Sequence, residues 1–132
     1  MEYVVILLKP GFLHLSGLVK QELQNLGLVL ESSKLIFITE DVARYWRESV
    51  RTKPYFEEMI EYHLSGQCFA MLWSGMSALD TALNYRGMYS EETKTGFRGK
   101  HGESPLRNAI HVSTKNEIVR DIEIFFPEYA KV

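Results

Sequence analysis

Cysteine is almost missing from this chain. Its 132 residues include one cysteine, Cys68, which lies in the apolar run of residues 68–73. One cysteine excludes an internal disulfide bond, and a tetrahedral zinc site requires several Cys or His ligands. We therefore predict that Cys68 is a buried core thiol and that the protein belongs to a reducing compartment, the cytoplasm.

A strong net charge of either sign is also missing. Fifteen Lys and Arg residues stand against seventeen Asp and Glu residues, which gives a formal net charge of −2. This balance argues against a general nucleic-acid binder and against a membrane-surface binder, but it is compatible with a local basic pocket. Hydrophobic residues make up 45% of the chain and aromatic residues 12%, which argues against disorder.

Long apolar runs and a Walker A loop are missing too. Residues 1–8 are mostly apolar, but the run is short, follows no basic segment and ends at Lys9-Pro10-Gly11. It therefore fits neither a signal peptide nor a membrane span. The glycines and the lysine of residues 96–100 do not have the spacing of a Walker A phosphate-binding loop.

What the chain does contain is a succession of strand and helix patterns. We predict strands at residues 3–9, 28–38, 67–73 and 108–112, and helices at residues 16–27, from 39 or 41 to about 51, 55–64, 76–86 and 115–126. Residues 87–106 have no apolar periodicity, which predicts a long functional or mobile loop. The order indicates a single α+β domain, residues 1–132, with a ferredoxin-like β-α-β-β-α-β sandwich, a four-stranded antiparallel sheet and a long loop before the last strand.

Several polar residues lie at strand ends or in the long loop. They are Lys9, Arg98, Lys100, Arg107, Asn108 and His111. Cations at strand ends and in a glycine-containing loop suit a phosphate group. A histidine beside them suits a base, a nucleophile or a ligand. Taken one at a time, however, the cations fit solvated surface better than a binding site, and a single histidine on an apolar strand is more often a hydrogen-bonded core residue than a catalyst.

Seven segments in the same order resemble motifs of one protein family. They are residues 9–10, 16–19, 53–56, 64–66 with 70–75, 95–99, 108–113 and 121–126. For example, Asn108-Ala109-Ile110-His111-Val112-Ser113 is similar to Asn-Ile-Ile-His-Gly-Ser, the segment that carries the nucleophile of nucleoside diphosphate kinases. From about residue 3 to residue 128 the chain resembles that family.

The resemblance implies a reaction and its catalytic residues. Members of the family move the γ-phosphoryl group of a nucleoside triphosphate, such as ATP, to a histidine and then to a nucleoside diphosphate, with ping-pong kinetics. By this resemblance His111 is the nucleophile, Asp121 holds its second ring nitrogen, and Ser113 lies close to it. A free imidazole with a pKa of about 6.5 is mostly neutral at pH 7, as a nucleophile must be.

The resemblance also implies the nucleotide site. Lys9 and Asn108 match residues that bind the sugar hydroxyls, Lys9 and Arg98 approach the phosphates, and Tyr55 matches a Phe that stacks on the base. Mg²⁺ is expected to arrive with the nucleotide, with few direct protein ligands. The expected partners are nucleoside di- and triphosphates, with no nucleic acid and no membrane, and copies of the chain in a homo-oligomer, either a hexamer or a tetramer of dimers.

Four positions depart from the family pattern. Leu83 aligns with a phosphate-binding Arg, Tyr89 with a phosphate-binding Thr, Arg47 with a Tyr, and Asp121 with a Glu. Arg86 lies three residues after Leu83, on the same helix face, and is the expected replacement cation.

These departures leave an alternative open: a kinase-like domain that binds nucleotide or a partner with little or no turnover. A third hypothesis is a purely structural or regulatory ferredoxin-like module that binds RNA or a metabolite. The near-neutral charge and the lack of an aromatic-rich strand motif argue against RNA.

Overall fold

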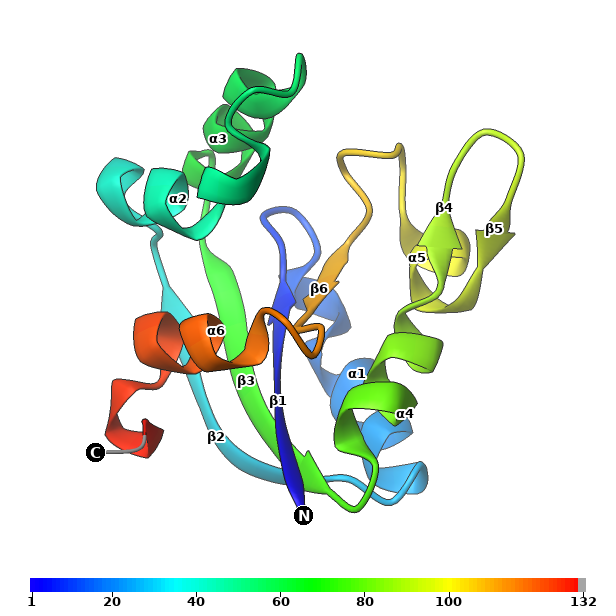
Figure 1. The fold of residues 1–132 in the computed structure, drawn as a ribbon. Coiled ribbons are helices and arrows are strands. Elements are labelled where there is room, and N and C mark those ends of the chain that lie inside the picture. Colours follow the sequence, from blue (N-terminus) through cyan, green and yellow to red (C-terminus); the bar gives the residue numbers. More distant parts are fainter. Residues whose placement is uncertain (131–132) are drawn as a thin grey trace.

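The computed structural model describes residues 1–130, which form a four-stranded antiparallel sheet with helices on both faces (Figure 1). The strands lie in the order β2-β3-β1-β6 and comprise Glu2–Leu8 (β1), Val29–Ile36 (β2), Cys68–Gly75 (β3) and Ile110–Val112 (β6). Each central strand, β1 and β3, is paired antiparallel on both sides. This arrangement confirms the predicted ferredoxin-like α+β fold.

The two central strands are apolar without alternation because both of their faces are covered. Residues 4–8 of β1 and residues 68–74 of β3 are buried, including the predicted core thiol Cys68. The edge strand β2 instead alternates between half-buried and exposed side chains. Its pairing with β3 shifts register between Leu30 and Ser32, which is the irregularity that a β-bulge introduces.

Three helices cover each face of the sheet. On one face lie α1 (Ser16–Asn25), α4 (Ala78–Arg86) and α5 (Gly96–His101); on the other lie α2 (Glu40–Trp46), α3 (Phe56–Leu64) and α6 (Ile118–Phe125). Short 3₁₀ turns occur at Leu13–Leu15 (η1), Glu48–Val50 (η2) and Pro127–Tyr129 (η3). Because successive strand residues point to opposite faces, β1 contributes Val4, Ile6 and Leu8 to one core and Val5 and Leu7 to the other.

The prediction of one long loop before the last strand was wrong in part. Residues 87–106 contain a two-stranded hairpin, Met88–Tyr89 (β4) with Lys94–Thr95 (β5), and then helix α5. Gly87 (φ +66°) and Gly96 (φ +59°) cross at the base of this hairpin, where a Cβ on Gly87 would lie 2.1 Å from the Thr95 carbonyl oxygen. The sharp return therefore needs glycine, and it brings α5 back against α4.

Some element boundaries also differ from the prediction. The last strand begins at Ile110 rather than at residue 108, because Ala109 adopts a left-handed conformation (φ +80°) that a strand cannot contain. Helix α2 ends at Trp46 and is followed by η2, where one helix to about residue 51 was predicted. Within residues 1–130, no helix has the length and the apolar composition required to cross a lipid bilayer.

Candidate functional site

His111 lies on the short edge strand β6, opposite Leu7 of β1. Its Nε2 atom is 2.7 Å from Oδ2 of Asp121. An ionised carboxylate can only accept a hydrogen bond, so Nε2 carries the proton and Nδ1 keeps a free lone pair. Only 3% of His111 is exposed, and the imidazole is therefore fixed in one orientation by its surroundings.

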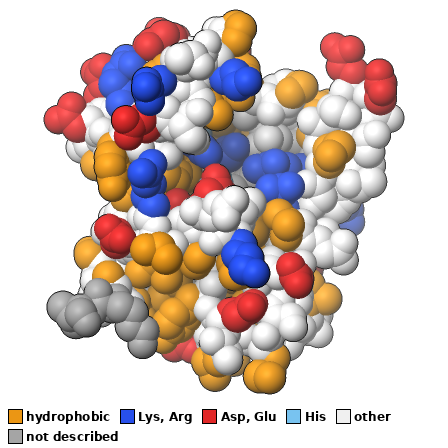
Figure 2. All heavy atoms as spheres, in the orientation of Figure 1, with side chains coloured by type: hydrophobic (Ala, Val, Ile, Leu, Met, Phe, Trp, Pro, Cys, Tyr) orange, Lys and Arg blue, Asp and Glu red, His pale blue; other side chains and the backbone are white. Residues whose placement is uncertain are grey.

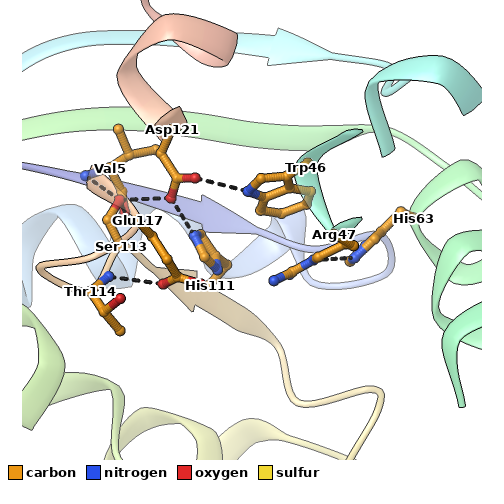
Figure 3. Close-up of polar contacts among 9 residues, drawn as sticks. All are labelled: Val5, Trp46, Arg47, His63, His111, Ser113, Thr114, Glu117 and Asp121. Carbon is orange, nitrogen blue, oxygen red and sulfur yellow. Dashed lines mark hydrogen bonds and ion pairs between the residues drawn. The ribbon is translucent and has the colours of Figure 1, made fainter. Parts of the chain in front are cut away.

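Asp121 lies in the first turn of α6 and connects three side chains (Figure 3). Its Oδ2 atom accepts from His111 and from Ser113 Oγ at 2.9 Å, and its Oδ1 atom accepts from Trp46 Nε1 at 2.9 Å. Ser113 also contacts Val5, since the Val5 amide donates to Ser113 Oγ at 3.1 Å. The structure thus brings together the three residues predicted to be catalytic, His111, Asp121 and Ser113, in one buried cluster.

The protonation states follow from burial and from these hydrogen bonds. Burial lowers the pKa of His111 below its ordinary value, and the hydrogen bond to Asp121 offsets only part of that effect. Burial alone would raise the pKa of Asp121, but hydrogen bonds from His111, Ser113 and Trp46 lower it overall. At pH 7 the pair is therefore a neutral imidazole beside an ionised carboxylate, the arrangement that a histidine nucleophile needs.

A cavity of about 590 Å³ lies beside this cluster. Its walls include Lys9, Arg47, Tyr55, Arg98 and Asn108. Lys and Arg side chains gather in a hollow on this side of the molecule, between the α2–α3 pair and the segment that carries α5 (Figure 2). A second cavity of about 740 Å³, between α1, α4 and α5, suits an anion less well, because its one lysine accompanies the carboxylates of two acidic residues.

Lys9 and Asn108 meet at one end of the cavity. Lys9 directly follows β1, and its Nζ atom donates to Asn108 Oδ1 at 2.6 Å. The left-handed Ala109 turns the chain between Asn108 and β6, and its carbonyl oxygen accepts from the Lys9 amide at 2.9 Å. Burial lowers the pKa of Lys9 well below its ordinary value, and repulsion from Arg47, Arg98 and Arg86 lowers it further.

Arg98 and Tyr55 occupy two other walls. Arg98 lies on α5, and its Nε atom donates to the Ile110 carbonyl oxygen at 3.0 Å, next to His111. Burial, with repulsion from neighbouring arginines, lowers the pKa of Arg98 to about 9, so the side chain stays charged at pH 7. Tyr55 immediately precedes α3 and is 45% exposed, which leaves its ring accessible to a ligand.

Arg86 is the predicted nucleotide-binding residue that does not line this cavity, and the three predicted catalytic residues, His111, Ser113 and Asp121, lie behind its lining as well. It ends α4, and its Nε atom donates to the Gly87 carbonyl oxygen at 3.1 Å. Its charge nevertheless acts on the site, since it lowers the pKa of both Lys9 and Arg98. Arg86 therefore adds to the positive potential of the cavity from a short distance outside its wall.

Three further residues belong to the site but were not predicted as part of it. They are Trp46, His63 and Glu117. Arg47 was noted in the sequence only as a departure from the family pattern, at a position where the family has a tyrosine. The sequence offers a local signal for Glu117 alone: its Oε1 accepts from the Thr114 amide at 2.9 Å, as in a T-x-x-E capping box. Its negative charge raises the pKa of His111, although burial has the larger, opposite effect.

The electrostatics of the cavity favour a polyanion. Lys9, Arg47 and Arg98 line it and Arg86 acts on it from outside, and none of these four forms an ion pair with a carboxylate within residues 1–130. Burial and mutual repulsion raise the free energy of this cluster, and a phosphate chain would offset both effects. The described residues also bring together no group of three or more His, Cys, Asp or Glu side chains suited to a metal ion.

Comparison with known proteins identifies relatives that have this fold. The family model described as nucleoside diphosphate kinase matches residues 2–130. A nucleoside diphosphate kinase of Bacillus cereus is 32% identical, with 97% of this chain and 90% of that protein covered. One of Halalkalibacterium halodurans is 30% identical, with 100% of this chain and 97% of that protein covered.

Solved structures give the same result. The nucleoside diphosphate kinase of Encephalitozoon cuniculi superposes with a TM-score of 0.92 at 26% identity, over 100% of this chain and 93% of that one. A halophilic nucleoside diphosphate kinase of Halobacterium salinarum, solved in complex with CDP, superposes with a TM-score of 0.89 at 26% identity, over 95% of this chain and 87% of that one. In sequence and in fold, this chain belongs to the nucleoside diphosphate kinase family.

Proposed function

We propose that this chain is an active nucleoside diphosphate kinase that transfers the γ-phosphoryl group of ATP or another nucleoside triphosphate to a nucleoside diphosphate through phosphorylated His111. The observation that carries the proposal is the free Nδ1 of His111, whose ring Asp121 holds through Nε2, near a cavity lined by Lys9, Arg47 and Arg98, none of which forms an ion pair within residues 1–130. The match to kinases over nearly the whole chain favours turnover over the alternative of a binding domain without activity.

The chemistry needs no proton to leave the histidine. The Nδ1 lone pair attacks the γ-phosphorus and forms a P–N bond, while the bond from phosphorus to the bridging oxygen breaks and the nucleoside diphosphate leaves with its electron pair. The ring then carries positive charge, which the Asp121 carboxylate stabilises through the Nε2 proton at 2.7 Å. A terminal phosphate oxygen of the acceptor diphosphate attacks the same phosphorus in the second half-reaction, and the ring nitrogen recovers its lone pair.

The remaining site residues take the roles that the resemblance to the family assigns to them. Lys9 and Arg98 bind the phosphates, with Arg86 as an additional cation, and Lys9 and Asn108 bind the sugar hydroxyls. The exposed ring of Tyr55 stacks on the base. Stacking accepts any base, because every base has a π-face. Ser113 keeps Asp121 oriented toward His111. The substrate is the Mg²⁺ complex of the nucleotide, whose own phosphates hold the ion.

The expected setting is a cytoplasmic homo-oligomer, a hexamer or a tetramer of dimers. The single buried cysteine, Cys68, supports a reducing compartment. An edge strand supports association, because β2 pairs only with β3 within residues 1–130 and Leu35 and Phe37 are 57% and 72% exposed at its end. Sedimentation velocity at micromolar protein will measure the assembly, and a monomer would contradict it.

Labelling of the protein tests the function directly. Incubation with γ-³²P-ATP and Mg²⁺ should produce an acid-labile, base-stable phosphate that His111→Asn lacks and that added GDP discharges. Because Nε2 is occupied by Asp121, the phosphorus should be bonded to Nδ1, which ³¹P NMR of the phosphorylated protein can establish. No label on wild-type protein at saturating Mg·ATP, or a label that survives His111→Asn, would contradict the proposal.

A further inference from the structure

Arg47 is a half-buried cation that the family pattern does not explain. It directly follows α2. The kinases that this chain resembles have a tyrosine at the same position. Its guanidinium carbon lies 3.8 Å from the ring centroid of Trp46, and its Nε atom donates to His63 Nε2 at 3.1 Å. Burial is the main cause that lowers its pKa, and no carboxylate within residues 1–130 forms an ion pair with it.

His63 can accept this hydrogen bond because it is neutral. Only 1% of the residue is exposed, and burial, with repulsion from Arg47 and Lys9, lowers its pKa to about 2. The proton of the neutral ring must lie on Nδ1, which leaves Nε2 as the acceptor. The bond uses the single Nε–H of Arg47, so the four N–H groups of the two terminal nitrogens remain for another partner.

The free end of Arg47 faces the nucleophile across Trp46. The Trp46 ring packs edge to face with His111 at 4.9 Å and lies beneath the guanidinium at 3.8 Å. In Figure 3 the terminal nitrogens of Arg47 extend toward His111, away from His63. Arg47 also lines the cavity with Lys9 and Arg98, and its charge lowers the pKa of His111. A planar fork of N–H donors in this place matches the paired oxygens of a phosphoryl group.

We infer that Arg47 binds the phosphoryl group while it passes between the nucleotide and His111, and that His63 is the positioning residue that fixes its guanidinium. The inference rests on the proposed function, because the ligand is the phosphate chain of the nucleoside triphosphate. It concerns the step in which the P–N bond to Nδ1 forms as the P–O bond to the nucleoside diphosphate breaks. Arg47 offsets negative charge on the phosphoryl oxygens and exchanges no proton or electron pair.

This assignment also explains how the chain compensates for Leu83. Typical members of the kinase family have a phosphate-binding arginine at this helix position. In this chain the position is a half-buried leucine of α4. Arg47, directly after α2, supplies a cation from the opposite side of the sheet. The site therefore keeps a multiple positive charge although one wall has lost its arginine.

Single-turnover phosphorylation of His111 by γ-³²P-ATP, with kcat and KM and with calorimetric binding of AMP-PNP, a non-hydrolysable ATP analogue that keeps the γ-phosphate, tests the inference. Arg47→Met should lower kcat/KM by about 10- to 100-fold through the loss of charge-assisted hydrogen bonds. Arg47→Lys should recover only part of this, since a lysine lacks the planar fork, and it remains informative if the methionine variant fails to fold. Arg51→Met is the matched control, because Arg51 is 66% exposed and paired with Glu48 at 3.7 Å, and it should retain wild-type kcat/KM.

The positioning role of His63 has its own readout. His63→Leu should lower kcat more than it raises KM, and His63→Gln, whose side-chain oxygen can accept from Arg47 Nε, should restore kcat to within about threefold of wild type. A purely structural role would lower the melting temperature of both variants and leave kcat unchanged for folded molecules.

The two proposals fail separately. If wild type turns over but Arg47→Met retains kcat/KM within threefold, the role of Arg47 is refuted and the kinase function stands. If wild type does not label at all, the kinase function fails, and the AMP-PNP affinities then decide about Arg47. Equal affinities of wild type and Arg47→Met, or no binding to either, would refute it as well.

Discussion

Replacing Asp121 with asparagine should disable His111 without emptying the nucleotide site. The wild-type carboxylate accepts from His111, Ser113 and Trp46 at 2.7, 2.9 and 2.9 Å. An asparagine has one acceptor oxygen, and if that oxygen keeps the Trp46 bond, the amide NH₂ faces His111. An NH₂ group cannot accept from Nε2–H, so the imidazole must either lose the bond or move its proton to Nδ1, the attacking atom.

Both outcomes slow the phosphorylation of His111. A hydrogen bond to a charged partner contributes about 1.5–3 kcal/mol, and each 1.36 kcal/mol changes a rate about tenfold. The lost bond alone therefore corresponds to a decrease of about 10- to 100-fold, and the wrong tautomer decreases the rate further. We expect at least a 100-fold lower rate for Asp121→Asn. The affinity for ADP should hardly change, since Asp121 is 1% exposed and does not line the cavity.

Rapid-quench measurement of the ³²P label on His111, with calorimetric binding of ADP, separates the two effects. Asp121→Glu is the matched control because it keeps the negative charge. Its extra methylene group, in a buried site, should cost about 1–3 kcal/mol of folding free energy and far less activity than the amide. A folded Asp121→Asn variant that labels within threefold of the wild-type rate would refute the role of the carboxylate in holding the tautomer.

Three other substitutions probe separate parts of the site. Tyr55→Ala should raise KM for ATP, GTP and CTP by similar factors of about 5- to 100-fold, because stacking of one base contributes about 1–3 kcal/mol. An increase in KM for only one of the three nucleotides would contradict stacking. Arg86→Met should lower kcat/KM about tenfold, and adding Leu83→Arg to that variant should restore it. A wild-type kcat/KM in Arg86→Met would exclude Arg86 from phosphate binding. His63 has a pKa of about 2 when folded and about 6.5 when unfolded, so the unfolded state takes up its proton first as the pH falls. It should therefore lower the free energy of unfolding by about 1.4 kcal/mol per pH unit below 6.5, and urea titrations should show that His63→Gln reduces the slope by this amount. The contribution of His111, whose pKa burial also lowers, should remain.

The sheet and the helices could be predicted because their signals are local. The continuous apolar run of residues 4–8 indicated a strand covered on both faces, and the structure buries all of it. Helix α1 begins at Ser16, as predicted from the sequence, and ends at Asn25, near the predicted end at Gly27. Periodicity reports how one segment meets a core, and it does not depend on partners elsewhere in the chain.

The structure of residues 87–106 could not be predicted in this way. The hairpin β4–β5 has two residues per strand, and α5 has a single buried apolar residue, Phe97. Elements this short have no repeating apolar pattern. Their geometry depends on the close crossing of Gly87 and Gly96, which are nine positions apart in the sequence. The sequence showed two glycines in a polar segment, which is compatible with almost any loop.

The same distinction applies to the candidate site, and it explains why the sequence offered no indication of Trp46 and assigned no role to Arg47. His111, Lys9 and Arg98 were found through short motifs, whereas Trp46 and Arg47 lie at the end of an ordinary amphipathic helix. Their importance follows only from contacts across the fold: Trp46 reaches Asp121, 75 positions away, and Arg47 reaches His63, 16 positions away. One indole thus holds the carboxylate with its N–H group, packs against the nucleophile with its edge and carries a guanidinium on its face. Because these three contacts share a single side chain, a change in α2 must alter the orientation of His111 and the positive charge of the cavity together. The orientations of His111 and Arg47 are therefore coupled through Trp46, although the sequence encodes these residues in separate segments.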